Sequence, residues 1–113
     1  MATTVPDPRI RQLKIKSNVV KRIAKDKEKY EEEYTTLQQK HDAMKASGAE
    51  DIAIKKSNEL LEETKMMISD CCSRLTKAYD DLETCFSDCS DLSDHEEYTF
   101  AKTILDGKSL CTH

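Results

Sequence analysis

Apolar side chains recur along the chain at steps of three and four residues, the spacing of one face of an α-helix. The longest stripe comprises Ile54, Leu61, Ile68, Cys71, Leu75, Ala78, Leu82, Cys85 and Cys89. An earlier stripe, interrupted by two lysines and one histidine, comprises Leu13, Lys16, Val20, Ile23, Lys27, Tyr30, Tyr34, Leu37, His41 and Met44. A shorter stripe comprises Tyr98, Ala101, Ile104, Leu105 and Cys111. The pattern predicts three amphipathic helices.

Residues that cap helices indicate where the first two helices begin and end. Asp7 followed by Pro8 is typical of a helix start, because Asp accepts from free N–H groups and Pro has none to lose there. Gly48 marks the end of this first helix, since glycine readily adopts the left-handed conformation. The next helix begins either at Asp51, which can cap it, or earlier through a capping box that starts at Ser47.

A second break precedes the third helix, for which Ser93 and Glu96 have the spacing of a capping box. The three predicted helices cover about residues 8–46, 51–88 and 94–111. Because the first connection is short, the two long helices are expected to form a hairpin. The sequence therefore predicts an all-α fold, an antiparallel three-helix bundle in a single domain of residues 1–113.

The short third helix is expected to cover only half of the long hairpin. Folded back, it lies beside residues 71–88, where a second apolar line appears at Cys72, Tyr79 and Phe86. In the other half, the additional apolar residues Leu60, Met66 and Met67 lie on the opposite flank, with no element left to bury them. Uncovered apolar surface is typical of a partner-binding site, and methionine is common on such surfaces.

Charge is unevenly distributed over the 113 residues, whose net charge is −4. Residues 9–29 contain nine basic and two acidic side chains, whereas residues 80–97 contain eight acidic side chains and no lysine or arginine. The two stretches face each other in the predicted hairpin, which disfavours nucleic acid as the partner of the basic one. No apolar run approaches the roughly 20 residues that span a bilayer, so no membrane partner is expected.

Residues with catalytic or metal-binding chemistry form no convincing constellation. Five cysteines are an odd number without zinc-like spacing, so reduced thiols are expected. His41 and His95 lie far apart in the predicted fold, so that no thiol has an obvious base. We expect neither an enzyme nor a bound cofactor or metal.

Several segments resemble the tubulin-binding cofactor A (tubulin-specific chaperone A) family. They are Asp7–Lys16, Val19–Arg22, Ile54–Lys56, the segment Lys65–Cys71, and after it Arg74–Leu75, Ala78–Tyr79 and Asp81–Leu82. The resemblance implies a non-enzymatic three-helix chaperone that captures β-tubulin after the cytosolic chaperonin and feeds heterodimer assembly, without nucleotide or metal. Ser69 stands where the family usually has proline, so the second helix is expected to be straighter there.

The predicted partner is β-tubulin, with other tubulin-folding cofactors as further candidates, in the cytoplasm and in association with the cytoskeleton. The candidate contact residues are Lys14, Lys16, Leu60, Lys65, Met66, Met67 and Ile68. The two N-terminal lysines are included because they can steer an acidic partner. The alternative is a structural coiled-coil module that oligomerises through the same flank, and the oligomeric state is expected to be a monomer or a weak homodimer.

Overall fold

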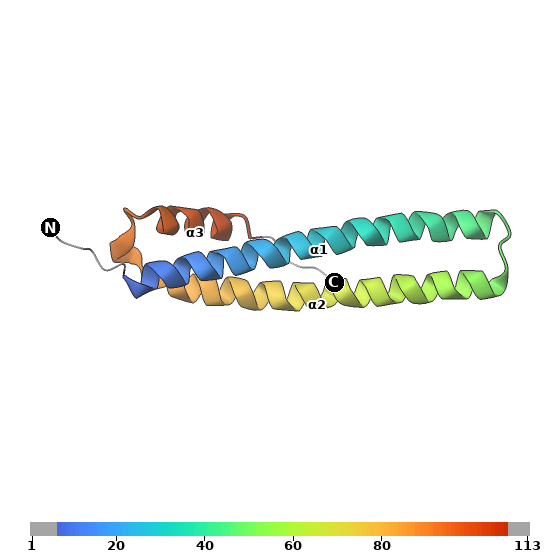
Figure 1. The fold of residues 1–113 in the computed structure, drawn as a ribbon, viewed down its shortest axis with the longest axis horizontal. Coiled ribbons are helices and arrows are strands. Elements are labelled where there is room, and N and C mark those ends of the chain that lie inside the picture. Colours follow the sequence, from blue (N-terminus) through green and yellow to red (C-terminus); the bar gives the residue numbers. More distant parts are fainter. Residues whose placement is uncertain (1–6, 109–113) are drawn as a thin grey trace. The chain divides into compact units, whose positions relative to one another are not determined.

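The computed structural model describes residues 7–108 and contains three α-helices and one short 3₁₀ turn in that range. Figure 1 shows α1 (Pro8–Ala46), α2 (Asp51–Ser87), η1 (Ser90–Leu92) and α3 (Glu96–Asp106). No strand occurs among these residues, so the predicted all-α class with three helices is confirmed. The chain divides into two compact units, one of residues 1–24 and 74–113 and one of residues 25–73, and both long helices contribute to each.

The start and end of α1 follow the sequence signals. The Asp7 carboxylate accepts a hydrogen bond of 2.9 Å from the backbone N–H of Arg9, as a capping residue does. At the other end Gly48 has φ +75°, and the N–H groups of Gly48 and Ala49 donate back to the carbonyls of Lys45 and Met44. These two bonds form the glycine-terminated helix end that the sequence predicts.

The start of α2 does not use a Ser47 capping box. The Ser47 hydroxyl donates instead to the carbonyl of Met44 at 3.1 Å, so it belongs to the end of α1. The carbonyl of Glu50 accepts the N–H groups of Ala53 and Ile54 and thereby opens α2 at Asp51.

The capping box predicted for the start of α3 is wrong, and the helix begins at Glu96 instead of near Asp94. Ser93 makes no capping box, because the residue before α3 is His95, which has no side-chain capping bond. The unpredicted turn η1 is the physical reason: the carbonyl of Leu92 accepts the N–H of His95 at 3.0 Å and holds these residues outside the helix. The helix ends at Asp106 before Gly107 instead of continuing to residue 111, and residues 109–111 lie outside the described part.

One core joins all three helices in the unit of residues 1–24 and 74–113. Its buried residues are Ile10, Leu13, Val20, Leu75, Ala78, Tyr79, Leu82, Cys89 and Ala101. The ring of Phe86 on α2 stacks on Tyr98 of α3 with centroids 4.4 Å apart, and Lys21 of α1 lies over the Phe100 ring at 5.8 Å. The expectation that the third helix covers the flank of Tyr79 and Phe86 is therefore confirmed.

The unit of residues 25–73 is a helical hairpin with a smaller apolar interior. Its buried residues are His41, Leu61, Thr64, Ile68, Cys71 and Cys72. His41 Nδ1 and the Ser57 hydroxyl lie 2.9 Å apart across the hairpin, and the Thr64 hydroxyl donates to the carbonyl of Leu60. His41 thus occupies the seam as a hydrogen-bonded core residue.

Arg9 links the beginning of α1 to the segment that precedes α3. Its guanidinium contacts both carboxylate oxygens of Asp91 at 2.9 Å, and it also bonds to Asp7 and to the carbonyl of Asp88 at 2.7 Å. The hydrogen bond from Arg9 holds the pKa of Asp7 and of Asp91 below the ordinary value of 3.8. A lowered carboxylate pKa stabilises the folded state above the unfolded-state pKa, and this stabilisation is lost as the pH falls through the folded-state pKa.

We therefore expect Arg9→Gln to lower the melting temperature at neutral pH, because both carboxylates lose their cation. The difference from the wild type should shrink as the pH falls below about 4, where the carboxylates protonate. Thermal denaturation followed by circular dichroism between pH 7 and pH 2 measures this, with the exposed neighbour Arg11→Gln as control. A difference that is independent of pH would contradict the role of Arg9.

Ser17 is the exception in the core, because its hydroxyl is fully buried and has no hydrogen-bond partner among residues 7–108. A buried unsatisfied hydroxyl costs about 1–3 kcal/mol. We expect Ser17→Ala to raise the free energy of unfolding by about 1 kcal/mol, since alanine removes that cost and favours the helix. Urea denaturation tests this, with the exposed Ser73→Ala as control, and a destabilised Ser17→Ala variant would show that the hydroxyl is satisfied.

Candidate functional site

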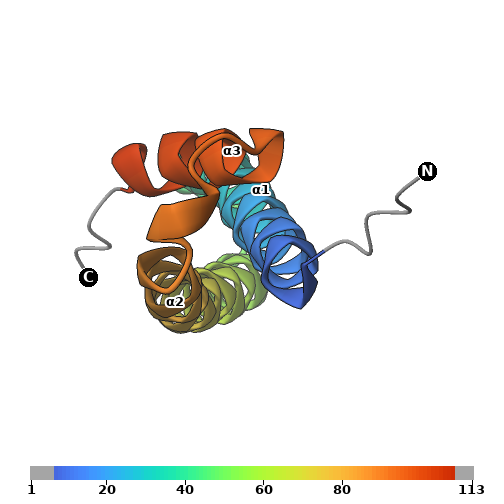
Figure 2. The ribbon, with the colours of Figure 1, turned by 90° about the vertical axis from the view of Figure 1, so that its left-hand side faces the viewer.

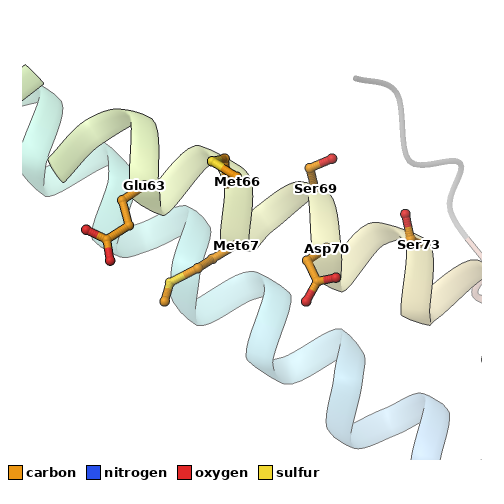
Figure 3. Close-up of a pocket in the computed structure, with 6 residues that line it drawn as sticks. All are labelled: Glu63, Met66, Met67, Ser69, Asp70 and Ser73. Atoms are coloured by element: carbon orange, nitrogen blue, oxygen red, sulfur yellow. The ribbon is translucent and has the colours of Figure 1, made fainter. Parts of the chain in front are cut away.

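The outer face of α2 in the unit of residues 25–73 carries an exposed apolar strip, which we call the methionine surface. It consists of Leu60, Met66 and Met67, whose side chains are 46%, 73% and 42% exposed. Both methionines line a shallow open hollow of about 570 Å³ together with Glu63, Ser69, Asp70 and Ser73, as Figure 3 shows. An open apolar strip with a polar border fits a protein partner better than a small substrate.

Helical geometry explains why the methionines face outward. The buried residues Leu61, Thr64 and Ile68 follow one another at steps of three and four, so they occupy the inner face of α2. Met66 and Met67 fall between these steps, and no described side chain covers them as Tyr79 and Phe86 are covered elsewhere. Their exposure follows from the register of the helix.

The predicted contact residues differ in their exposure to solvent. Lys65 is exposed and adjoins the methionine surface in sequence, whereas Ile68 is only 6% exposed and lies in the interior of the hairpin. Ile68 belongs to the apolar stripe, and the same spacing that predicted the stripe buries it. It can support the methionine surface from within but presents no surface of its own.

Lys14 and Lys16 belong to the other compact unit. Lys14 is exposed, and Lys16 is partly buried at the rim of a separate groove that includes Ile15 and Val19. Sequence reasoning missed this groove, although a signal existed. Ile15, Val19 and Ile23 follow each other at steps of four, on the flank of the α1 stripe.

Cysteine chemistry does not define a reactive site among residues 7–108. Cys71, Cys85 and Cys89 are not disulfide-bonded, and burial raises the pKa of Cys89, which disfavours its reactive thiolate. Cys72 is disulfide-bonded, so the expectation of reduced thiols is wrong at this position. An odd number of cysteines requires one unpaired thiol but does not exclude a pair.

The described range contains neither a metal-binding cluster nor a membrane-spanning helix. No group of three or more His, Cys, Asp or Glu side chains there has the geometry to hold a metal ion. No helix between residues 7 and 108 is long and apolar enough to cross a bilayer.

The helices of residues 7–108 and their exposed apolar face define a class of small all-helical proteins with an uncovered apolar surface. Within that class, the chain belongs to the tubulin binding cofactor A family, whose model matches residues 8–105. It is 47% identical to the tubulin-specific chaperone A of Rattus norvegicus over 104 residues, which is 92% of this chain and 96% of the relative. The family resemblance read from the sequence is confirmed.

Two solved structures support the same assignment. The crystal structure of tubulin folding cofactor A from Arabidopsis thaliana matches with a TM-score of 0.83 and 34% identity, covering 88% of this chain and 94% of that chain. Human tubulin chaperone cofactor A matches with a TM-score of 0.78 and 43% identity, covering 88% and 96%.

Paired substitutions on α2 test the division between surface and interior. We expect Ile68→Ala to lower the free energy of unfolding by about 2–5 kcal/mol, because it opens a cavity in the hairpin. Met66→Ala should change it by less than about 0.5 kcal/mol, because an exposed side chain loses little packing. Urea denaturation measures both, and equal costs for the two variants would contradict the assigned register of α2.

Proposed function

We propose that this chain is a non-enzymatic tubulin-folding cofactor that captures β-tubulin folding intermediates released from the cytosolic chaperonin and feeds heterodimer assembly. Membership in the tubulin binding cofactor A family supports tubulin as the client. The observation that carries the proposal is the methionine surface, because a chaperone must offer apolar area to a client whose own apolar area is exposed.

The chemistry of this surface suits an incompletely folded client. Methionine is unbranched and polarizable, so its side chain can adapt to apolar groups of irregular shape. Burying a fully exposed methionine yields about 1.5–3 kcal/mol, which is enough for reversible capture when several contacts combine. Polar residues at the border, such as Glu63, Lys65 and Asp70, limit the area that the client can cover.

The proposed working form is a single antiparallel three-helix domain that acts in the cytoplasm, with no cofactor or metal. The four-residue connection between α1 and α2 supports the antiparallel order, since so short a link reverses the chain. Other tubulin-folding cofactors are proposed as further partners, because a captured client has to be passed on.

An alternative is a coiled-coil module that associates with itself through the methionine surface, which such self-association would also bury. Analytical ultracentrifugation separates the two proposals. A monomer or weak dimer that gains mass with β-tubulin supports the cofactor. A stable homodimer that Met66→Glu dissociates would support the coiled-coil module instead.

Met66→Glu is expected to weaken β-tubulin capture by about tenfold or more, because the client would have to bury a carboxylate without a partner. The measurement is the fraction of β-tubulin released from the chaperonin that co-migrates with the variant on native gels. Gln39→Glu, which adds the same charge at an exposed position on α1, is the matched control. Unchanged capture by Met66→Glu, with unchanged helicity, would remove the methionine surface from the proposal.

A further inference from the structure

A second apolar surface lies in the unit of residues 1–24 and 74–113, where α1 and α2 border an open groove of about 320 Å³. Its apolar part is formed by Ile15, Val19 and Ile23 of α1 and by Ala78 of α2. Ile15 is 44% exposed, although isoleucine is among the residue types most often buried. A second hollow of about 400 Å³ continues the groove and shares Lys16 and Asp81 with it.

The groove lies on the flank of this unit that α3 leaves uncovered. Contacts of α3 involve Lys21 of α1 and Phe86 of α2, through Phe100 and Tyr98. Figure 2 shows α3 on one side of the pair formed by the blue start of α1 and the orange end of α2. None of these α3-contacting residues lines the groove, so a segment of helical width can pack there against the same two helices.

The rim of the groove indicates the charge of its occupant. Three cations, Lys16, Arg74 and Lys77, stand there with one carboxylate, Asp81. Within residues 7–108 neither Lys16 nor Lys77 has an ion-pair partner within 4.0 Å, so both ammonium groups are available to an incoming carboxylate. The net charge of the chain is −4, so its acidic surfaces repel an acidic partner. The cationic rim therefore directs such a partner to the groove and favours one orientation of it there.

We propose that this groove binds an acidic amphipathic helix of the client polypeptide. Its apolar face packs on Ile15 and Val19, and its carboxylates pair with Lys16 and Lys77. The client would thus be held at two places, by the methionine surface and by the groove. This inference rests on the proposed capture of a client, but it concerns other residues and can fail independently.

A synthetic helical peptide tests the groove directly. The probe is about 18 residues long, or five turns, with leucine on one face and glutamate elsewhere. Amide chemical shifts of the full ¹⁵N-labelled chain are followed during titration, and the expected changes are at Ile15, Val19 and Lys77. A peptide with lysine in place of every glutamate is the control. Shifts confined to Met66 and Met67, or equal binding of both peptides, would overturn the proposal.

Substitutions give the second measurement. We expect Lys16→Glu combined with Lys77→Glu to weaken binding of the acidic peptide by about tenfold, and Ile15→Glu to do so independently. Arg11→Glu combined with Lys102→Glu makes the same change of charge at exposed positions outside the groove lining, and should weaken binding by less than about threefold. Equal losses in both double variants would show a general charge effect and contradict the groove. Circular dichroism confirms that each variant is folded.

Client capture distinguishes this inference from the proposed function. If Met66→Glu abolishes β-tubulin capture while the groove variants capture normally, the groove proposal fails and the proposed function stands. If the groove variants also lose capture by about tenfold, both stand. If the wild type captures no β-tubulin but binds the acidic peptide in the groove, the proposed function fails, and the groove remains an acidic-helix site without that client.

Discussion

The structure depends on the burial of one narrow apolar stripe along α2. From Leu61 through Ile68 and Leu75 to Leu82, the buried residues recur every seven positions, with one or two further buried residues in each interval. Long polar helices such as α1 and α2 gain little from intrinsic propensity alone and are stabilised mainly by packing of such a stripe. Side chains on the flanks of the stripe are not needed for this packing. They are therefore covered by α3, exposed to water or available to a partner.

The difference between the two units follows from this division of flanks. In one unit α3 adds Tyr98 and Ala101 to Tyr79 and Phe86 of α2, and the core becomes three-sided. In the other unit only two helices share the interior, which accordingly includes the polar pair His41 and Ser57. A two-helix interior has no third surface on which additional apolar side chains can be buried, and the methionines stay outside.

Features that depend on periodicity and local capping could be predicted from the sequence. Features that depend on tertiary contacts mostly could not. The stripes, the Asp7–Pro8 start and the Gly48 end were predictable because each is decided within one or two helical turns. The bidentate contact of Arg9 with Asp91 joins residues 82 positions apart, and no local signal specifies it. The turn η1 was missed for a related reason, since Leu92 packs against the core and this tertiary contact is not specified locally.

For the candidate site, sequence reasoning found the methionine surface, but it also included Ile68 among the contact residues, which the structure buries. Met66 and Met67 were expected to be exposed because they lie off the stripe, and the same argument, applied strictly, places Ile68 inside. The α1–α2 groove was missed because attention to a single stripe ignores its flanks. Ile15 and Val19 were each explicable as isolated surface residues, and only the packing of α2 beside them shows that they share a groove.

Exposed apolar surface has a cost for a protein with so small a core. This chain leaves a groove and four large apolar side chains open to water, namely Ile52, Leu60, Met66 and Met67. It forgoes the free energy of burying them, and such exposed surface promotes self-association. Charged residues limit that risk: Glu63 and Asp70 border the methionine surface, Lys65 precedes Met66 in sequence, and Lys16 and Lys77 border the groove. Two copies brought together by their grooves would oppose lysine to lysine, whereas an acidic client meets the complementary charge. The same cations that favour a client therefore act against a homodimer formed groove to groove.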